Sequence, residues 1–377
     1  MGVVNGINNG YSTNKRAALY YKTEPLYTDV SRYVHTNNWE ILQSIKILNS
    51  LGFSVDLIDR MNNNWNPTNS YDLFLGLGVG NTGRNFARYA KLSNAPTKIL
   101  LAMGPQPDVS NRRTIGRYEL FRERTGRHAP PMRTVQDVTG DRFVEITKAA
   151  DFIFSVGEIG TPSYNSFLGH DVPVLNFYPS TSPKVRFTEE WADDRDRNTF
   201  LCFAGNGFIC KGVDLVVEAF LRDPTKQLNI CGPSSERSFF EQYNGPISSA
   251  PNIKYHGFIE PGGTRFNQLA SKCSYVIFHS AAEGCCTSVA TAIRAGLVPI
   301  VNPWTGILIE GKEGIMMSED GDLISNISQA VNLATDVDDD TYRSMSVAAY
   351  EKSKLFTQES FTISYRDAVI SAIEASK

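Results

Sequence analysis

The amino-acid sequence predicts an α/β protein built from two doubly wound, parallel-sheet domains that face each other across a cleft. Strand-like apolar runs alternate with helical patterns twice along the chain, and this alternation is typical of parallel sheets covered by helices. A polar segment with two prolines, residues 179–198, separates the two series and is expected to be a linker. The length of 377 residues suits two domains of ordinary size.

The first series begins with a predicted strand at residues 16–23. A helix is predicted next, because apolar residues recur at helical spacing between a capping residue, Thr36 or Asn37, and Gly52. The remaining strands of this half are expected within residues 53–59, 71–78, 97–104, 151–156 and 172–178.

The second series repeats the pattern after the linker. Its strands are expected within residues 200–206, 227–233, 252–259, 274–280 and 297–303. Its helices are expected within residues 212–221, 264–272 and 287–296, and from Asp322 onward. The predicted domains are residues 1–185 and 186–355, with a helix over residues 356–377 that packs back toward the first domain. Ligands of such sheets bind at the carboxyl ends of the strands.

Composition and charge exclude several classes of protein. Lys and Arg number 37 against 40 Asp and Glu, a net charge of −3, which argues against a nucleic-acid partner. No apolar run approaches the roughly 18 residues of a membrane span, and the N-terminus lacks the apolar core of a signal peptide. The six cysteines form no C-x-x-C pair, which is typical of reduced thiols. A cytoplasmic protein without metal or cofactor is predicted.

A lysine at the start of a predicted helix is the first candidate for chemistry. The strand before it ends at Gly205, and Lys211 and Gly212 open the helix. An ammonium group beside the free N–H groups of a helix start favours a phosphate. The alternative is an ordinary surface lysine in a loop.

A glutamate after another strand is the second candidate. Glu283 and Gly284 form a sharp loop, and Thr287 or Ser288 is expected to cap the following helix. Free N–H groups there favour an anion, whereas a carboxylate suits neutral hydroxyls such as those of a sugar. The alternative for Glu283 is a partner of the helix dipole. Cys285 and Cys286 are interpreted as loop residues rather than nucleophiles.

These two stretches resemble motifs of GT-B glycosyltransferases, specifically the retaining family 4 type with its two Rossmann-like domains. The family's G-R-x4-K-G is matched from Gly205 to Gly212, and its E-G-x-x-x-S-V-x-E segment is matched from Glu283 onward. The resemblance covers residues 199–377. It implies a metal-independent transfer in which Lys211 stabilises the leaving diphosphate and Glu283 orients the sugar. It places donor binding at Gly205, Asn206, Gly207, Gly284, Cys285, Cys286, Thr287, Ser288 and Thr291.

Two positions depart from the family pattern. Asn206 replaces its arginine, and Thr291 replaces the second glutamate of its E-x7-E motif, which grips the ribose. Weaker or altered donor binding is therefore expected. A catalytically silent partner subunit, or a sugar-nucleotide epimerase or hydrolase, stays open as an alternative.

The first half offers weaker candidates. Lys22, His35 and Asn37 are expected near the interdomain edge, on the acceptor side. Gly80 belongs to a G-x-G-x-x-G run from Gly78 to Gly83, expected as a loop that faces the cleft. No acidic residue follows about 20 positions later, which argues against a nicotinamide-dependent oxidoreductase.

Seven arginines lie between Arg112 and Arg133, opposed by Glu119 and Glu123. This segment could meet an anionic acceptor or the inner face of a membrane, or it could be a solvated helix with internal Glu–Arg pairs. The combined prediction is a glycosyltransferase that moves a sugar from a nucleotide-sugar donor to a carbohydrate or lipid-linked acceptor. Retention of configuration and a role in surface polysaccharide biosynthesis are implied by the resemblance.

Overall fold

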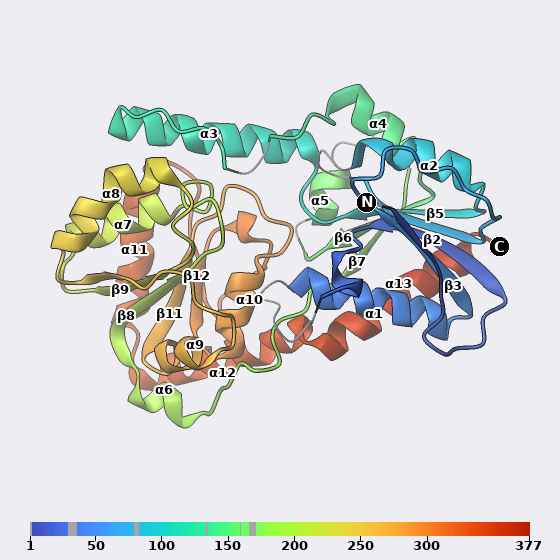
Figure 1. Ribbon diagram of the computed structural model, residues 1–377. Coiled ribbons are helices and arrows are strands. Elements are labelled where there is room, and N and C mark those ends of the chain that lie inside the picture. Colours follow the sequence, from blue (N-terminus) through green and yellow to red (C-terminus); the bar gives the residue numbers. More distant parts are fainter. Residues whose placement is uncertain (1, 29–35, 79–82, 133–134, 159, 166–170) are drawn as a thin grey trace. The chain divides into compact units, whose positions relative to one another are not determined.

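The computed structural model describes residues 2–28, 36–78, 83–132, 135–158, 160–165 and 171–377 (Figure 1). The chain divides into two compact units. The first unit contains residues 1–109, 136–180 and 358–377, and the second contains residues 110–135 and 181–357. The chain therefore passes from one unit to the other four times.

The first unit is built on a sheet with the strand order β1-β3-β2-β4-β5-β6-β7 among the residues described. Its strands are parallel except β1, which runs antiparallel to β3. β1 was not predicted, because a short edge strand with two polar or glycine positions carries little apolar pattern. The strands are β1 (Val3–Ile7), β2 (Lys15–Tyr21), β3 (Phe53–Asp59), β4 (Leu73–Leu77), β5 (Thr97–Ala102), β6 (Phe152–Val156) and β7 (Val174–Phe177).

Helices cover both faces of this sheet. The helix predicted after the first strand is present as α1 (Thr36–Ser50), and it is followed by Gly52 at a positive φ of 89°. The C-terminal helix α13 (Gln358–Ala375) packs on α1 and β7 through edge-to-face aromatic contacts that Phe361 makes with Trp39 and Phe177. The other helices are α2 (Phe86–Ser93), α4 (Gly140–Lys148) and α5 (Gly160–Asn165).

The second unit is built on a sheet with the order β10-β9-β8-β11-β12-β13, parallel throughout the described residues. The two sheets confirm the predicted α/β class. Residues 179–198 are not merely a linker, because they contain α6 (Glu190–Asp194) and the start of β8. The strands are β8 (Asp196–Phe203), β9 (Gln227–Cys231), β10 (Ile253–Tyr255), β11 (Cys273–Phe278), β12 (Val298–Val301) and β13 (Ile315–Met316).

Residues 110–135 belong to this second unit, although they lie within the expected first domain, residues 1–185. They include most of α3 (Pro107–Thr125), which lies beside α7 and α8 (Figure 1). The helices of the second unit after α6 are α7 (Val213–Arg222), α8 (Arg237–Ser249), α9 (Thr264–Ala270), α10 (Thr287–Arg294), α11 (Leu323–Asp336) and α12 (Asp339–Ser353).

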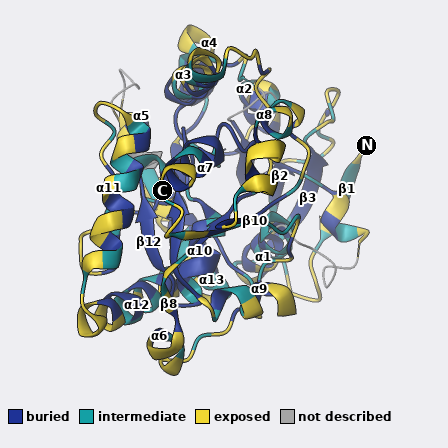
Figure 2. Cartoon of the chain, turned by 90° about the vertical axis from the view of Figure 1, so that its left-hand side faces the viewer, coloured by how far each residue is buried: buried dark blue, intermediate teal, exposed yellow. Residues whose placement is uncertain are grey.

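Burial follows the layers of each unit. Figure 2 shows the central strands as mostly buried and the edge strand β1 as intermediate to exposed, whereas helices such as α6 and α11 carry exposed residues on their outer sides. Within the described ranges, no helix is both long enough and apolar enough to cross a bilayer.

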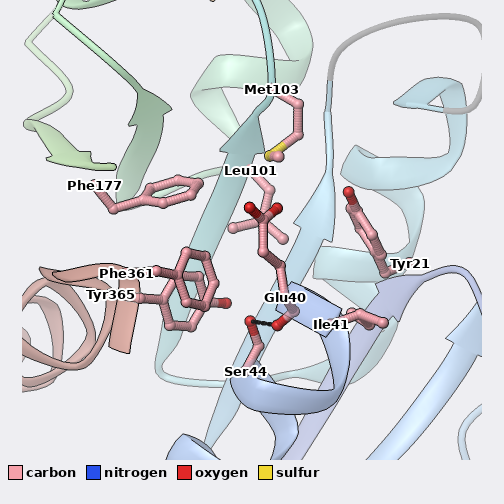
Figure 3. A pocket seen from close by; sticks show the side chains of 9 residues that line it. All are labelled: Tyr21, Glu40, Ile41, Ser44, Leu101, Met103, Phe177, Phe361 and Tyr365. Carbon is pink, nitrogen blue, oxygen red and sulfur yellow. Dashed lines mark hydrogen bonds between the residues drawn. The ribbon is translucent and has the colours of Figure 1, made fainter. Parts of the chain in front are cut away.

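A glutamate is buried in the first unit at the carboxyl ends of β2, β5 and β7 (Figure 3). Glu40 is 5% exposed, and its Oε1 accepts hydrogen bonds from the backbone N–H and the hydroxyl of Ser180, at 2.7 and 3.0 Å. The cavity beside it holds about 20 Å³, room for one water molecule. Burial raises the pKa of Glu40 to about 7. The residues that line the cavity are Tyr21, Glu40, Ile41, Ser44, Leu101, Met103, Phe177, Phe361 and Tyr365.

This raised pKa predicts that the protein loses stability as the pH rises from about 5 to about 8. The folded chain holds the Glu40 proton up to pH values near 7, whereas the unfolded chain releases it near the ordinary value of 4.5, so ionisation favours unfolding. The cost is up to about 3 kcal/mol at about 1.4 kcal/mol per pKa unit. We expect Glu40→Gln to remove this dependence and to be more stable than the parent at pH 8.

Urea unfolding at several pH values measures the effect. Glu145→Gln, which changes an exposed glutamate of α4, is the matched control and should keep the parental slope. Parallel stability curves for the parent and Glu40→Gln between pH 5 and 8 would contradict the assignment.

Candidate functional site

The two loops that the sequence singled out meet at the carboxyl edge of the second unit's sheet. The first connects β8 to α7, and its turn is closed by hydrogen bonds from Lys211 N to Gly207 O at 3.0 Å and from Val213 N to Phe208 O at 2.9 Å. Gly207 and Gly212 have positive φ values of 87° and 71°, which glycine adopts without strain. Lys211 therefore lies immediately before the first turn of α7.

The second loop follows β11 and carries Glu283. Its backbone is fixed by hydrogen bonds from Glu283 N to Trp304 O and from Cys286 N to Thr305 O, both 2.8 Å. Gly306 lies against it so closely that a Cβ there would stand 2.1 Å from Gly284 O. The loop thus rests on the turn after β12 with no spare room.

The structure joins the two loops directly. Lys211 Nζ lies 2.6 Å from Glu283 Oε1, and the side chains are only 14% and 11% exposed. Ala281 N also donates to Cys210 O at 2.8 Å, which fixes the backbones on either side of the ion pair. An ammonium and a carboxylate shielded from water attract strongly, so the pair holds a charged, oriented group of each sign at one point of the sheet edge.

The start of α10 lies just beyond Glu283. Its N-cap is Cys286, rather than the predicted Thr287 or Ser288, and the backbone N–H groups of Ser288 and Val289 face the Cys286 sulfur, which is only a weak acceptor. Burial raises the pKa of the Cys286 thiol to about 11, so this sulfur is neutral near pH 7 and is a poor nucleophile. Cys285, Thr287 and Ser288 are half-buried beside this helix start.

The two residues that depart from the family pattern, Thr291 and Asn206, have different surroundings. The Thr291 side chain is buried inside α10 and donates its hydroxyl to Thr287 O at 2.6 Å. Asn206 is exposed and accepts a hydrogen bond from the Ser235 hydroxyl at 2.7 Å. Gly205 is half-buried beside it. The ion pair is therefore built without either residue.

The residues predicted on the acceptor side lie in the first unit or outside the residues that the structure describes. Lys22 is half-buried and donates to Asn38 Oδ1, and burial lowers its pKa. Asn37 donates to the Tyr21 hydroxyl at 3.4 Å. His35 and Gly80 lie outside the described residues. In the ranges described, no three His, Cys, Asp or Glu side chains gather as metal ligands would.

The arginine-rich segment is used largely inside the second unit. Arg124 pairs with Asp214 and Glu218 on α7, and Arg113 pairs with Glu319. The expected internal Glu–Arg pairs of a solvated helix are therefore not its main contacts, because these arginines reach acidic groups on other elements. Arg112 and Arg122 remain exposed, and Arg133 lies outside the description.

Sequence reasoning missed a second layer of polar residues behind the two loops. Glu236 links the loop between β8 and α7 to α3, because its Oε2 accepts from Ile209 N at 2.9 Å and its Oε1 accepts from the Tyr118 hydroxyl at 2.6 Å. Burial raises the pKa of this carboxyl. The sequence carries one signal of this layer, which is helical spacing. The buried positions of α3 follow that spacing at 110, 114, 117, 118 and 121. Three of these residues are polar, so the sequence alone favours a solvated helix face.

Solved structures share this fold at low sequence identity. Sucrose-phosphate synthase from Thermosynechococcus elongatus superposes with a TM-score of 0.69 at 12% identity, covering 96% of this chain and 100% of that one. A glycosyltransferase from Rickettsia africae ESF-5 gives 0.64 at 11%, covering 97% and 100%. HepE from Anabaena, in complex with UDP and glucose, gives 0.62 at 10%, covering 96% and 100%.

The chain has a GT-B fold. No protein-family model and no curated protein matches the sequence. In this GT-B chain the paired residues Lys211 and Glu283 lie on the two loops whose motifs suggested the fold, at the strand ends where such sheets bind ligands.

The close packing of the two loops predicts a large effect at Gly212. A Cβ there would lie 2.2 Å from the backbone oxygen of His279, and φ is positive. We expect Gly212→Ala to destabilise the protein by more than about 2 kcal/mol, because neither backbone segment can move freely.

Gly116→Ala is the matched control, since Gly116 lies exposed inside α3 with open space around its Cα. Alanine should stabilise that helix by about 0.5–1 kcal/mol. Denaturant unfolding measures both variants. Equal stability of Gly212→Ala and the parent would mean that the loops are not packed as described.

Proposed function

We propose that this protein is a metal-independent, retaining glycosyltransferase that moves a sugar from a nucleotide-sugar donor to a carbohydrate or lipid-linked acceptor. The observation that carries the proposal is the shielded pair of Lys211 and Glu283 beside the start of α10. A setting in the cytoplasm and in surface polysaccharide biosynthesis is part of the proposal, on the basis of the family resemblance.

The proposed transfer requires positive charge at the place where the leaving group forms. When the bond between the sugar and the nucleoside diphosphate breaks, the diphosphate gains negative charge. The Lys211 ammonium and the backbone N–H groups at the start of α10 both stabilise an anion at this edge of the sheet. In this proposal they do the work that a metal ion does in other transferases.

Glu283 is given the role of orienting the sugar. Its carboxylate accepts hydrogen bonds, so it suits neutral hydroxyls and repels phosphate. Paired with Lys211, it holds the ammonium at the boundary between the sugar and the diphosphate. Gly284 to Ser288 are proposed to contact the phosphates or the sugar through their backbone.

The class of donor draws support from the similar structures. HepE is described in complex with UDP-glucose, and the pneumococcal transferase GtfA in complex with UDP and GlcNAc. For this chain a nucleoside diphosphate sugar is therefore the donor class we propose. Lys22 and Asn37 are kept as acceptor-side residues, and an anionic acceptor or membrane lipid remains a candidate for the exposed arginines of α3.

A second candidate function follows from Thr291. Its hydroxyl is bonded to its own helix, and Asn206 cannot supply the positive charge of an arginine. Both observations favour a glycosyltransferase-like partner subunit that lacks activity of its own. Such a subunit would neither transfer the sugar nor hydrolyse the donor.

We expect Lys211→Met to lower transfer by about 10- to 100-fold, because a charge-assisted hydrogen bond is worth about 1.5–3 kcal/mol. A thermal-shift panel of nucleoside diphosphates and nucleotide sugars first identifies the donor, since a ligand that binds the folded chain raises its melting temperature. The same ligand should stabilise Lys211→Met much less.

Lys226→Met is the matched control. Lys226 Nζ also makes two hydrogen bonds, to Asn198 Oδ1 at 2.9 Å and to Thr335 Oγ1 at 3.0 Å, but it lies away from the two loops. It should keep parental transfer. Near-parental turnover in Lys211→Met removes the lysine from the mechanism, and donor hydrolysis without any acceptor would favour a hydrolase or epimerase.

A further inference from the structure

Three successive carbonyl groups after β11 are each held by a side chain. Arg117 Nη1 donates to His279 O at 2.8 Å, Asn302 Nδ2 donates to Ser280 O at 2.8 Å, and Arg113 Nε donates to Ala281 O at 2.5 Å. Backbone carbonyls buried away from water need such donors. The path of the chain toward Glu283 is therefore set by side chains of α3 and of the β12 end.

Arg117 makes the most enclosed of these contacts. It is 5% exposed, and its Nη2 lies 2.9 Å from Nδ1 of the His279 ring, so one guanidinium holds both the backbone and the side chain of the same residue. Burial, with Arg117 as a second cause, keeps the pKa of His279 well below its usual value. The imidazole is thus neutral, with Nδ1 as acceptor and its proton on Nε2, which makes no hydrogen bond within the described residues although Glu319 Oε1 lies 3.3 Å away.

Arg113, one turn earlier on α3, secures the next part of the loop. Its guanidinium stacks over the Trp304 ring at 4.2 Å and pairs with Glu319. Trp304 O in turn accepts from Glu283 N. Glu319 also accepts from Asn302 Nδ2 at 2.6 Å, so the groups that hold the carbonyls are bonded to one another.

Arg117 also touches the loop that carries Lys211. A Cβ at Gly212 would lie 2.7 Å from Arg117 Nη1, so the guanidinium is wedged between Gly212 and His279. Ala281 N and Cys210 O are hydrogen-bonded just beyond it. Arg117 therefore packs against both loops that carry the ion pair, without contacting Lys211 or Glu283 through any hydrogen bond described.

We propose that Arg117 is a positioning residue that holds the backbone at His279, and through the loop that follows it Glu283, in the register where the carboxylate meets Lys211. The expected effect on kcat rests on the proposed function, because the position of Glu283 matters for turnover only if this site transfers a sugar. Its structural part, the coupling between Arg117 and Glu283, can be measured without any activity.

Arg124 provides the comparison within the same helix. It is also an enclosed arginine, but it pairs with Asp214 and Glu218 on α7 and makes no described contact with either loop. Asp214 also attracts Arg117 electrostatically, so the loss of Arg124 should weaken the attachment of α3 and disturb the ion pair much less than the loss of Arg117 does. Comparing variants of Arg117 and Arg124 therefore distinguishes a positioning role from a general contribution to stability.

The decisive experiment is a double-mutant cycle on the unfolding equilibrium, using Arg117→Met, Glu283→Gln and the double variant. We expect the unfolding constants to depart from additivity by at least about threefold, because the two sites share one loop. The parallel cycle with Arg124→Met should be additive within about twofold. Arg117→Lys and Arg124→Lys replace the methionine variants if those do not fold.

Two further readouts distinguish positioning from general damage. In Arg117→Met the His279 ring loses the guanidinium that bonds to its Nδ1, so proton NMR should show changed chemical shifts for the ring protons, a change that Arg124→Met should not produce. With an identified donor, kcat should fall at least tenfold while the affinity for the free nucleoside diphosphate changes less than threefold. Arg117→Lys should recover part of kcat.

The outcomes separate the two proposals. Additive stabilities for Arg117 and Glu283 overturn the positioning role whatever the activity. Non-additive stabilities in a protein that binds no nucleotide sugar sustain the positioning role and overturn the proposed function. Equal loss of kcat in Arg117→Met and Arg124→Met would show that only the attachment of α3 matters.

Discussion

The ion pair between Lys211 and Glu283 is the interaction that joins the two loops of the candidate site. Two nearly enclosed opposite charges are stable together, whereas either one alone would face a large desolvation penalty. The pair therefore requires two loops from distant parts of the chain to keep a fixed register. The glycines, the Ala281–Cys210 hydrogen bond and the closely packed turn after β12 all serve that requirement.

Much of the fold could be predicted from the sequence because strands and helices leave strong periodic patterns. The central strands of both sheets and α1 and α10 are where the apolar pattern indicated them. β1 and α6 were missed, since a short edge strand and a charged single turn carry almost no periodic signal. The placement of residues 110–135 could not be predicted, because a helix that begins in one unit and packs in the other is not visible in the order of elements.

The site was predictable only in its loops. Motif spacing selected Lys211 and Glu283, but no local rule says that residues 72 positions apart form an ion pair. Thr291 donates its hydroxyl to its own helix, as a buried threonine readily does to the carbonyl four residues earlier, and its expected contact with the donor stays a prediction. Arg113 and Arg117 were read as surface charge. Their true partners, carbonyl groups of another loop, leave no trace in composition.

The excess of arginine on α3 shows how a charged stripe can be structural. Guanidinium groups present several donors in a fixed plane, so one side chain satisfies a carbonyl and a ring nitrogen together, as Arg117 does at His279. Lysine offers no such fixed geometry. This explains why the buried position 117 is an arginine, and half-buried Arg124 uses the same fixed plane to pair with Asp214 and Glu218 together.

The most direct test of the account is a crystal structure of the protein with its preferred nucleoside diphosphate bound. The account predicts that the terminal phosphate lies within hydrogen-bond distance of Lys211 Nζ and of backbone N–H groups in the first turn of α10, with Glu283 left to face the sugar side. A nucleotide bound elsewhere, with the Lys211–Glu283 pair untouched, would contradict it.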